Sequence, residues 1–555
     1  MNKILFTSLL ITSICGLCTQ AKAQLMQAKE LYSKADSLRG QLTPLRSCYD
    51  IQYYHLDVKV DLDNKFISGS NLFKFKAVND FNKLQFDLFD NLSVDKIVYH
   101  GNELLFTRDY NAVFVTFPKT IKKNQNDEFI VFYSGNPIQA TRAPWDGGID
   151  WKRDSNGKHF VATAVQGLGA SAWWPNKDHQ SDEPDSMLIS VTVPKDLVNV
   201  SNGRLIKKEM FDDGHNKYHW LVTNPINNYN VSLNIGDYVT MQEKVKTEKG
   251  LLDVEYYILR ENDTPTKKKH LNINVAQTLE ALEYWFGPYP FFEDSYKIVE
   301  TAHLGMEHQS AIAYGNNYQN GYRGFDSSNT GWGKKWDFII VHESGHEWFG
   351  NNITAADIAD MWIHESFTNY SEALFIDYHY GKEAGQAYVY GNRAGIKNDK
   401  PMQGPYHVNK EGSGDMYLKG GVFWNMIRTM VNDDTKWRSI LRALNHHFRH
   451  KQVDYNDILN YISTHTSLNL DKVFEQYIQN KTIPVLDVKF NSNGDVLARW
   501  LTDVKDFHMP IHLGIEKNYK LIKLTDKYTK INIKGLSKAN LSVDTYNYYI
   551  NTKVQ

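Results

Sequence analysis

The alternation of apolar and polar residues divides the chain into parts with different periods. Residues 53–60 and 72–78 alternate with the period of two that is typical of half-buried strands. Clusters rich in Asn, Asp and Gly separate such segments, for example at 61–64 and 212–216. The pattern predicts a β-rich domain of many short strands over residues 45–241.

Near residue 264 the period lengthens to that of a helix. Residues 267–286 carry apolar side chains at helical spacing, and Gly287-Pro288 would end that helix. Mainly helical sequence continues to about residue 481. The pattern predicts a mainly helical central domain over residues 242–482.

Strand-like alternation returns after Leu486, as in residues 521–524 and 531–533. A small β domain is therefore expected over residues 483–555. The whole chain is predicted to be a multidomain α+β protein.

The first 23 residues have the parts of a secretory signal peptide. Lys3 provides the positive start, residues 4–18 are mostly apolar, and Ala21-Lys22-Ala23 matches the small-x-small cleavage pattern. The alternative is a membrane anchor, but the apolar stretch is at the short edge of the roughly 17–25 residues that a span needs. We expect export to the periplasm or the medium, with no stable membrane insertion after cleavage.

Three cysteines and a balanced charge narrow the possibilities further. Cys15 and Cys18 would leave with the signal peptide, so Cys48 would remain alone and no internal disulfide is expected. The 62 basic and 64 acidic residues give a net charge of −2, without the positive bias typical of nucleic-acid binding. No nucleic-acid partner is expected. Because the overall charge indicates no other partner, the function has to be inferred from local motifs.

The segment from His342 to His346 reads His-Glu-Ser-Gly-His and follows an apolar run. Residues four apart share one face of a helix, so both imidazoles can reach one ion, and zinc favours such ligands. Glu343 would point elsewhere on the helix, beside the water that attacks the substrate, as a general base does. Gly345 costs a helix about 1 kcal/mol relative to Ala, which indicates a reason beyond packing. With 20 histidines in the chain, a chance match is the competing interpretation.

A third ligand candidate is Glu365, which follows His346 after eighteen residues and lies in a segment that continues helically to Leu374. Two His and one Glu leave a fourth position open for water, as in catalytic zinc sites. One Zn²⁺ per chain is predicted. Glu372 either supports a ligand from behind or is an ordinary surface residue.

This spacing resembles the zinc signature of the gluzincin aminopeptidases, the aminopeptidase N and leukotriene hydrolase family. The resemblance runs from about Tyr53 to the end of the chain. It implies a saddle-like N-terminal β domain, a thermolysin-like catalytic domain and a small C-terminal β-sandwich. The large helical C-terminal domain of many members has no counterpart, so a more open cleft is expected.

The same resemblance implies residues that bind the substrate's free amine. The segment 304–308 is similar to the family's Gly-x-Met-Glu-Asn strand, which puts Glu307 on the α-ammonium and Gly305 and Met306 along the cleft. Leu304 and His308 depart from that pattern. Gln166 matches a position where members place a Gln or Glu on the same ammonium; a buried structural Gln is the competing interpretation.

Tyr417 begins a segment similar to the family's Tyr-x-Lys-Gly motif, whose phenol stabilises the oxyanion of the intermediate. The competing interpretation is an ordinary packed Tyr at a helix start. Together these matches imply a zinc aminopeptidase that cleaves peptides with a free N-terminus, with Glu343 as the base. A zinc endopeptidase, an epoxide hydrolase and a catalytically silent peptide-binding protein stay as alternatives.

Overall fold

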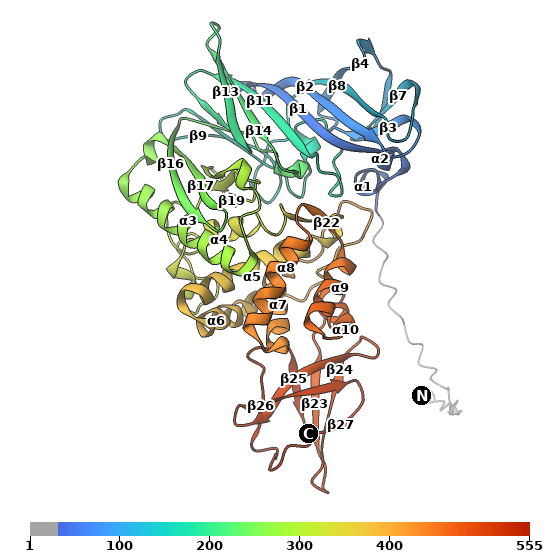
Figure 1. Cartoon of the computed structure of the whole chain (residues 1–555), viewed down its shortest axis with the longest axis vertical. Helices are drawn as coiled ribbons and strands as arrows, with labels where there is room; N and C mark the ends of the chain where they lie inside the picture. Colours follow the sequence, from blue (N-terminus) through green and yellow to red (C-terminus); the bar gives the residue numbers. More distant parts are fainter. Residues whose placement is uncertain (1–31) are drawn as a thin grey trace, which may run out of the picture.

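The computed structural model describes residues 32–555. The expected signal peptide, with Cys15 and Cys18, lies outside this range, and Cys48 is a buried free cysteine. Three parts follow one another along the long axis: an N-terminal β domain, a mainly helical centre and a small β part at the end (Figure 1). No helix within residues 32–555 is both long enough and apolar enough to cross a membrane.

The N-terminal part is built on an eight-stranded sheet in which β1 and β11 pair in parallel. Tyr54 of β1 pairs with Phe73 of β2, and their rings meet edge to face at 5.0 Å. The strands, in sheet order, are β13 (Arg204–Met210), β14 (His215–Val222), β11 (Ser186–Pro194), β1 (Tyr49–Asp61), β2 (Phe66–Ala77), β8 (Asn126–Gly135), β4 (Leu92–Tyr99) and β5 (Asn102–Glu103).

Two smaller sheets and two short helices complete this part. One sheet contains β12 (Val198–Val200), β15 (Asn234–Gly236), β10 (His159–Ala164) and β9 (Gly148–Arg153); the other contains β3 (Phe81–Asp87), β7 (Ala112–Ile121) and β6 (Phe106–Asp109). The helices α1 (Lys34–Gly40) and α2 (Pro44–Ser47) precede β1. Arg46 of α2 is buried and forms an ion pair with Asp87 of β3 at 2.7 Å, which ties the start of the described chain to the β domain.

The central part combines a five-stranded sheet with helices. The sheet contains β16 (Tyr238–Thr247), β17 (Gly250–Leu259), β18 (Tyr296–Glu300), β20 (Ile312–Tyr314) and β19 (Gly305–Met306). The expected boundary between residues 241 and 242 falls inside β16. A short parallel pair, β21 (Ile353–Ala355) with β22 (Lys451–Val453), lies apart from it.

The helix predicted over 267–286 is confirmed as α3 (Pro265–Phe286). Thr264 caps its first turn, and Gly287 ends it with a φ of 95°, a backbone angle that glycine adopts without strain. The remaining α-helices are α4 (Phe338–Gly345), α5 (Trp362–Tyr380), α6 (Lys382–Asn392), α7 (Leu418–Val431), α8 (Asp434–His447), α9 (Tyr455–Thr466) and α10 (Asp471–Phe474).

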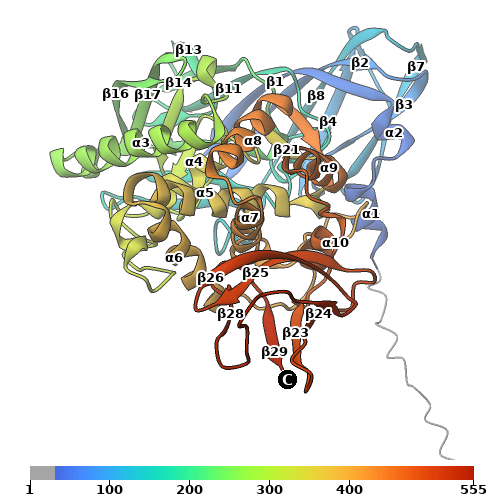
Figure 2. The ribbon, with the colours of Figure 1, turned by 60° about the horizontal axis from the view of Figure 1, so that its bottom comes forward.

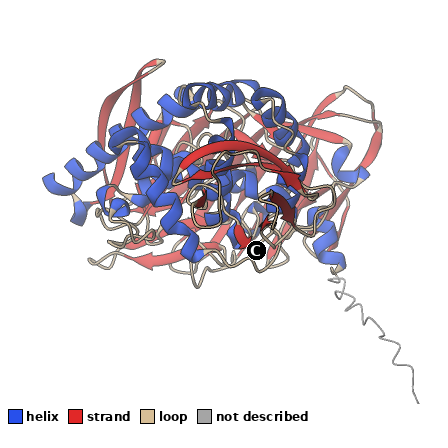
Figure 3. Cartoon of the chain, turned by 90° about the horizontal axis from the view of Figure 1, so that it is seen from below, coloured by secondary structure: helices blue, strands red, loops and turns tan. Residues whose placement is uncertain are grey.

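The C-terminal part consists of two small sheets, and it continues the hydrophobic core of the central part. One contains β27 (Thr529–Lys530), β24 (Val496–Leu501), β23 (Val485–Phe490) and β29 (Asn551–Val554); the other contains β26 (Asn518–Thr525), β25 (His508–Ile515) and β28 (Leu541–Val543). Figure 2 shows β24 and β25 close to α7 and α10. Seen from below, these strands lie across the helices (Figure 3).

One local expectation in this part is wrong. The strand predicted at 531–533 is absent, because β27 ends at Lys530. Ile531 is buried, and its backbone N–H donates to Val496 O at 2.8 Å. The apolar spacing there reflects an irregular segment that packs one side chain into the core.

Candidate metal centre and active site

The two histidines of the His-Glu-x-x-His segment lie at the C-terminal end of α4. Asp337 begins this helix by accepting hydrogen bonds from the N–H groups of Ile339 and Ile340. His342 is in the helix, and His346 follows it with helical angles of φ −64° and ψ −24°. Both imidazoles therefore keep the one-face arrangement that the spacing predicts.

Helix α5 passes very close to α4 at Gly345. A Cβ atom on Gly345 would lie 2.5 Å from Ser371 Oγ and 3.2 Å from Thr368 Cγ2, both on α5. The expectation that this glycine has a reason beyond packing is wrong: packing is the reason. The close approach of the two helices brings Glu365 of α5 to the histidines of α4.

The three predicted ligands converge on one point. Their ligand atoms lie within 4.8 Å of one another, with Glu365 Oε2 at 3.4 Å from His346 Nε2 and 3.8 Å from His342 Nε2. Glu365 Oε2 is buried and has no hydrogen-bond partner within the described residues. Two imidazole nitrogens and an unsatisfied carboxylate oxygen fit Zn²⁺, which binds such donors tetrahedrally.

The far nitrogen of each imidazole is held by an acceptor. His342 Nδ1 lies 2.8 Å from Glu372 Oε1, and His346 Nδ1 lies 3.0 Å from Phe349 O. Because a carbonyl and an ionised carboxylate can only accept, both Nδ1 atoms carry the proton and both Nε2 atoms are left for a metal. Glu372 is fully buried, so its interpretation as a surface residue is wrong.

Glu343 lies on the same helix and faces the short strand β19. A Cβ atom on Gly305 would lie 2.6 Å from Glu343 Oε1, so glycine at this position lets the strand pass against the carboxylate. Burial raises the pKa of Glu343 to about 7. A carboxyl group with such a pKa can both accept and return a proton near neutral pH. Burial opposes ionisation of Glu365 as well, but the imidazoles of His346 and His342, when protonated, lower its pKa to about 2.

Glu307 follows β19 and is buried beside the three ligand candidates. Its Oε1 accepts hydrogen bonds from Tyr229 OH at 3.1 Å and from Gln166 Nε2 at 2.5 Å. Gln166 Nε2 also lies 3.3 Å from Glu365 Oε1. Gln166 thus connects the β domain to both carboxylates, and burial raises the pKa of Glu307.

Tyr417 precedes α7 and lies over the metal ligands. Its ring is nearly parallel to that of His342, with the centroids 6.0 Å apart. Cβ atoms on Gly420 and Gly421 would lie within 2.4 Å of Ser366 and 2.2 Å of Asn369 on α5, so these glycines allow α7 to approach. Burial and the nearby carboxylates raise the pKa of Tyr417 well above its usual value, which keeps the phenol protonated as a donor.

All nine predicted site residues line one cavity of about 310 Å³. Leu304, one of the two departures from the family pattern, also lines it, whereas His308 is fully buried elsewhere. The sequence analysis missed the remaining lining residues: Pro144, Trp145, Gly167, Tyr322, Phe338, Ile339 and Glu411. Trp145, Tyr322 and Glu411 come from loops. Tyr322 lies in the Gly-, Ser- and Asn-rich segment 321–333, whose composition indicates a loop, whereas nothing in the local sequence of Trp145 or Glu411 separates them from other loop residues.

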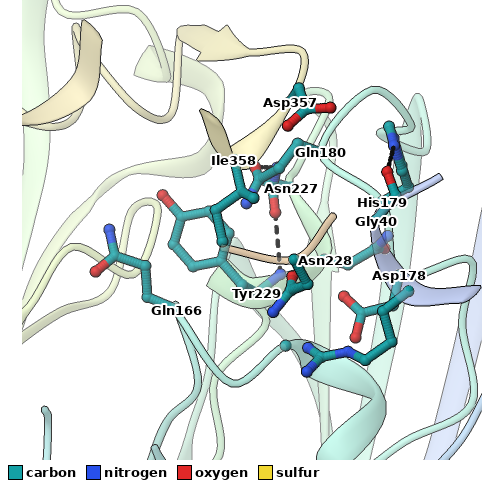
Figure 4. Close-up of a pocket in the computed structure, with 13 residues that line it drawn as sticks. Gly40, Gln166, Asp178, His179, Gln180, Asn227, Asn228, Tyr229, Asp357 and Ile358 are labelled. Atoms are coloured by element: carbon teal, nitrogen blue, oxygen red, sulfur yellow. Dashed lines mark hydrogen bonds between the residues drawn. The ribbon is translucent and has the colours of Figure 1, made fainter. Parts of the chain in front are cut away.

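A small polar pocket lies next to this cavity, where α1, the β domain and the central part meet. Gln166 and Tyr229, the two donors to Glu307, lie on one side of it (Figure 4). Asp178 and His179 lie on the other side, and His179 Nε2 is 3.3 Å from Gly40 O. The start of the described chain therefore packs behind the loop that carries Gln166.

Comparison with known families identifies both large parts of the chain. Residues 271–477 match the peptidase family M1 domain, and residues 51–229 match the peptidase M1 N-terminal domain. The chain belongs to peptidase family M1. The family and the α+β fold expected from the sequence are thereby confirmed.

The M1 protein is similar to curated aminopeptidases along part of their length. It is 22% identical over 419 residues to probable aminopeptidase 1 of Saccharolobus solfataricus, covering 71% of this chain and 51% of that protein. It is 24% identical over 306 residues to aminopeptidase N of Lactobacillus helveticus, covering 52% of this chain and 34% of that protein. The chain spans about half the length of such relatives, or less.

Among solved structures, an M1 zinc metallopeptidase mutant of Deinococcus radiodurans bound to a Tyr-Ser-Ala substrate has the same fold. The TM-score is 0.67 at 19% identity, covering 80% of this chain and 98% of that one. The unmutated enzyme gives a TM-score of 0.65 at 20% identity, and the match covers 78% of this chain and 94% of that one. The M1 family and the donor set formed by His342, His346 and Glu365 confirm zinc as the predicted cofactor.

Proposed function

We propose that this M1 protein is a zinc aminopeptidase that removes the N-terminal residue from peptides. The observation that carries the proposal is the position of Glu307. Its carboxylate lies within 4.8 Å of the ligand atoms of Glu343 and His346, and among residues 32–555 no Lys or Arg lines the cavity. The two hydrogen-bond donors to Glu307, Tyr229 and Gln166, are neutral, so its buried charge still lacks a cation, and the free α-ammonium of a peptide supplies one.

The distance from Glu307 to the metal ligands supports an exopeptidase rather than an endopeptidase. An ammonium held between Glu307 and Gln166 is separated from the first peptide carbonyl by a single carbon atom. That carbonyl then lies beside the metal ligands, because the Glu307 carboxylate is within 4.8 Å of the ligand atoms of Glu343 and His346. Gln166 orients Glu307, and its amide oxygen can accept from the same ammonium.

The remaining residues divide the chemistry of hydrolysis among them. Zinc held by His342, His346 and Glu365 would supply Lewis-acid polarisation of the scissile carbonyl and lower the pKa of the attacking water. Glu343 takes the proton of that water and returns it to the leaving amine. Tyr417 donates a hydrogen bond to the oxygen on which negative charge develops.

The direct test uses one peptide and its N-acetylated copy, incubated with the purified zinc-loaded protein and analysed by mass spectrometry. The proposal predicts stepwise loss of single residues from the free peptide and no cleavage of the acetylated copy. Internal cleavage of both peptides would make the protein an endopeptidase. No cleavage of either peptide by zinc-loaded protein would instead favour a binding protein or another class of substrate.

We also propose that the protein is exported and loses residues 1–23. The support is the signal-peptide pattern that ends at Ala23. N-terminal sequencing of the protein purified from its native cells should begin at Gln24. Cytoplasmic protein with its N-terminal segment intact would contradict export.

A further inference from the structure

Glu411 is a carboxylate of the cavity with no role in the chemistry described above. It lies in the loop between α6 and α7 and is half-buried. Its Oε1 lies 3.0 Å from the point that a Cβ on Gly167 would occupy, and Gly167 follows Gln166 in the chain. Glu411 therefore lies on the wall of the cavity beside the residues that receive the α-ammonium.

The Glu411 carboxylate has no hydrogen-bond or ion-pair partner within residues 32–555, and its side chain is half-buried in the cavity wall. Burial raises the pKa of Glu411, and Glu365 and Glu307 raise it further. Lys400 is the cation that acts against them, but it is exposed and makes no ion pair with Glu411. The carboxylate is held among like charges without a cation of its own.

The ionisable side chains that line the cavity are mostly acidic. Of the residues that the structure describes, four with carboxylates line it, Glu307, Glu343, Glu365 and Glu411, and no Lys or Arg does. When all four carboxylates are ionised, the double charge of zinc and the single charge of an α-ammonium leave one negative charge uncompensated. A second positive charge on the substrate would balance the cavity.

The position of Glu411 limits where that second charge can be. Its Oε1 lies against Gly167, the neighbour of Gln166, and the carboxylates that act on it are those of Glu365 and Glu307. On the other side, around Glu343, the lining includes the apolar side chains of Ile339 and Phe338. The first side chain of a peptide shares its Cα with the bound amine, so it begins beside Glu307 and extends into the cavity that Glu411 also lines.

We propose that Glu411 is a specificity-determining residue that selects peptides whose first residue is Arg or Lys. This inference rests on the proposed aminopeptidase function and adds a substrate class to it. A guanidinium or ammonium at the end of the first side chain pairs with the Glu411 carboxylate inside the cavity. A charge-assisted hydrogen bond there is stronger than one at the protein surface.

The test compares three tripeptides that differ only in the first residue: arginine, citrulline or leucine, each followed by Ala-Ala. Citrulline has the shape of arginine but a neutral urea group, so the comparison isolates the charge. The enzymes are the wild type, Glu411→Gln, and Glu383→Gln as a control that makes the same chemical change at an exposed position of α6. The measured quantity is kcat/KM for each combination of enzyme and peptide.

The wild type and Glu383→Gln should cleave the arginine peptide at least about tenfold better than the citrulline peptide, as expected for a hydrogen bond to a charged group. Glu411→Gln should lose that preference while its kcat/KM for the citrulline and leucine peptides stays within about twofold of the wild type, since neither offers the carboxylate a charge.

Two results would overturn the inference. One is equal kcat/KM for the arginine and citrulline peptides in the wild type; the other is an equal loss for all three peptides in Glu411→Gln. In both cases cleavage of the leucine peptide by the wild type would leave the proposed aminopeptidase function standing. Failure to cleave all three peptides would instead contradict the aminopeptidase function itself.

Discussion

Glu372 accepts a hydrogen bond from His342 Nδ1 at 2.8 Å, and both side chains are buried. The same carboxylate accepts from Asn369 Nδ2 at 3.1 Å and from Tyr388 OH at 2.6 Å. Three donors thus hold Glu372 in one orientation, and through it they fix the tautomer and direction of a zinc ligand.

Replacing Glu372 should weaken zinc binding without removing a ligand. We expect Glu372→Gln to lower zinc affinity by about 10–100-fold, the usual cost of losing a carboxylate behind a ligating histidine. Competition against a chromophoric chelator measures the change. The surface variant Glu383→Gln should bind zinc as the wild type does, and an unchanged affinity in Glu372→Gln would show that the hydrogen bond does not support the ligand.

Replacing Glu343 separates proton transfer from metal binding. Glu343→Gln keeps the shape of the side chain but cannot accept the proton of the attacking water, so turnover should fall at least about 100-fold. Zinc content, measured by atomic spectroscopy, should stay at one per chain because Glu343 is not among the ligands. Wild-type turnover in this variant would exclude Glu343 as the base.

The contact between α4 and α5 at Gly345 predicts a rescue experiment. Gly345→Ala places a methyl group 2.5 Å from Ser371 Oγ, and overpacking of this kind costs about 1–3 kcal/mol. The midpoint of thermal unfolding should therefore fall, and zinc affinity should fall with it because the ligands move apart.

Ser371→Ala removes the hydroxyl that the new methyl group meets. Combined with Gly345→Ala, it should recover part of the lost stability, whereas Ser371→Ala alone should not raise it. Strictly additive effects of the two substitutions would mean that the contact does not couple them.

The phenol of Tyr417 should act on kcat rather than on KM. Tyr417→Phe removes a donor that is needed only where charge develops, so kcat should fall by about 100-fold while KM changes little. Steady-state kinetics on a free tripeptide measures both, with Tyr390→Phe as a control at a half-exposed tyrosine outside the cavity. A fall in stability with unchanged kcat would assign Tyr417 a packing role.

How far the sequence predicts the site depends on how local each interaction is. His342 and His346 share a helical face because of their spacing alone, and Glu365 follows soon enough that the next helix carries it. By contrast, the partners of Glu372 include Tyr388, which reaches it only because α6 packs against α5. The burial of Glu372 could not be predicted before that packing was known.

The roles of Gly345 and Glu411 also depend on contacts between segments that are distant in the sequence, so local sequence does not predict them. The neighbour that requires a glycine at Gly345 is Ser371, on a different helix, so its sequence context indicates only a poor helix former. Glu411 becomes a cavity residue because its loop meets Gly167 of the N-terminal part. Long apolar periods predicted α3 well, whereas the short alternation at 531–533 did not specify a strand.

The central claim, that a free N-terminus is recognised beside the zinc, is tested most directly through Glu307. The measurement is the ratio of kcat/KM for a free tripeptide and its N-acetylated copy, in the wild type and in Glu307→Gln. We predict a ratio of at least about 100 in the wild type, the strength of a buried charge-assisted contact, and a collapse of that ratio in the variant because only cleavage of the free peptide slows. Equal rates for both peptides in the wild type, or an unchanged ratio in Glu307→Gln, would contradict the account.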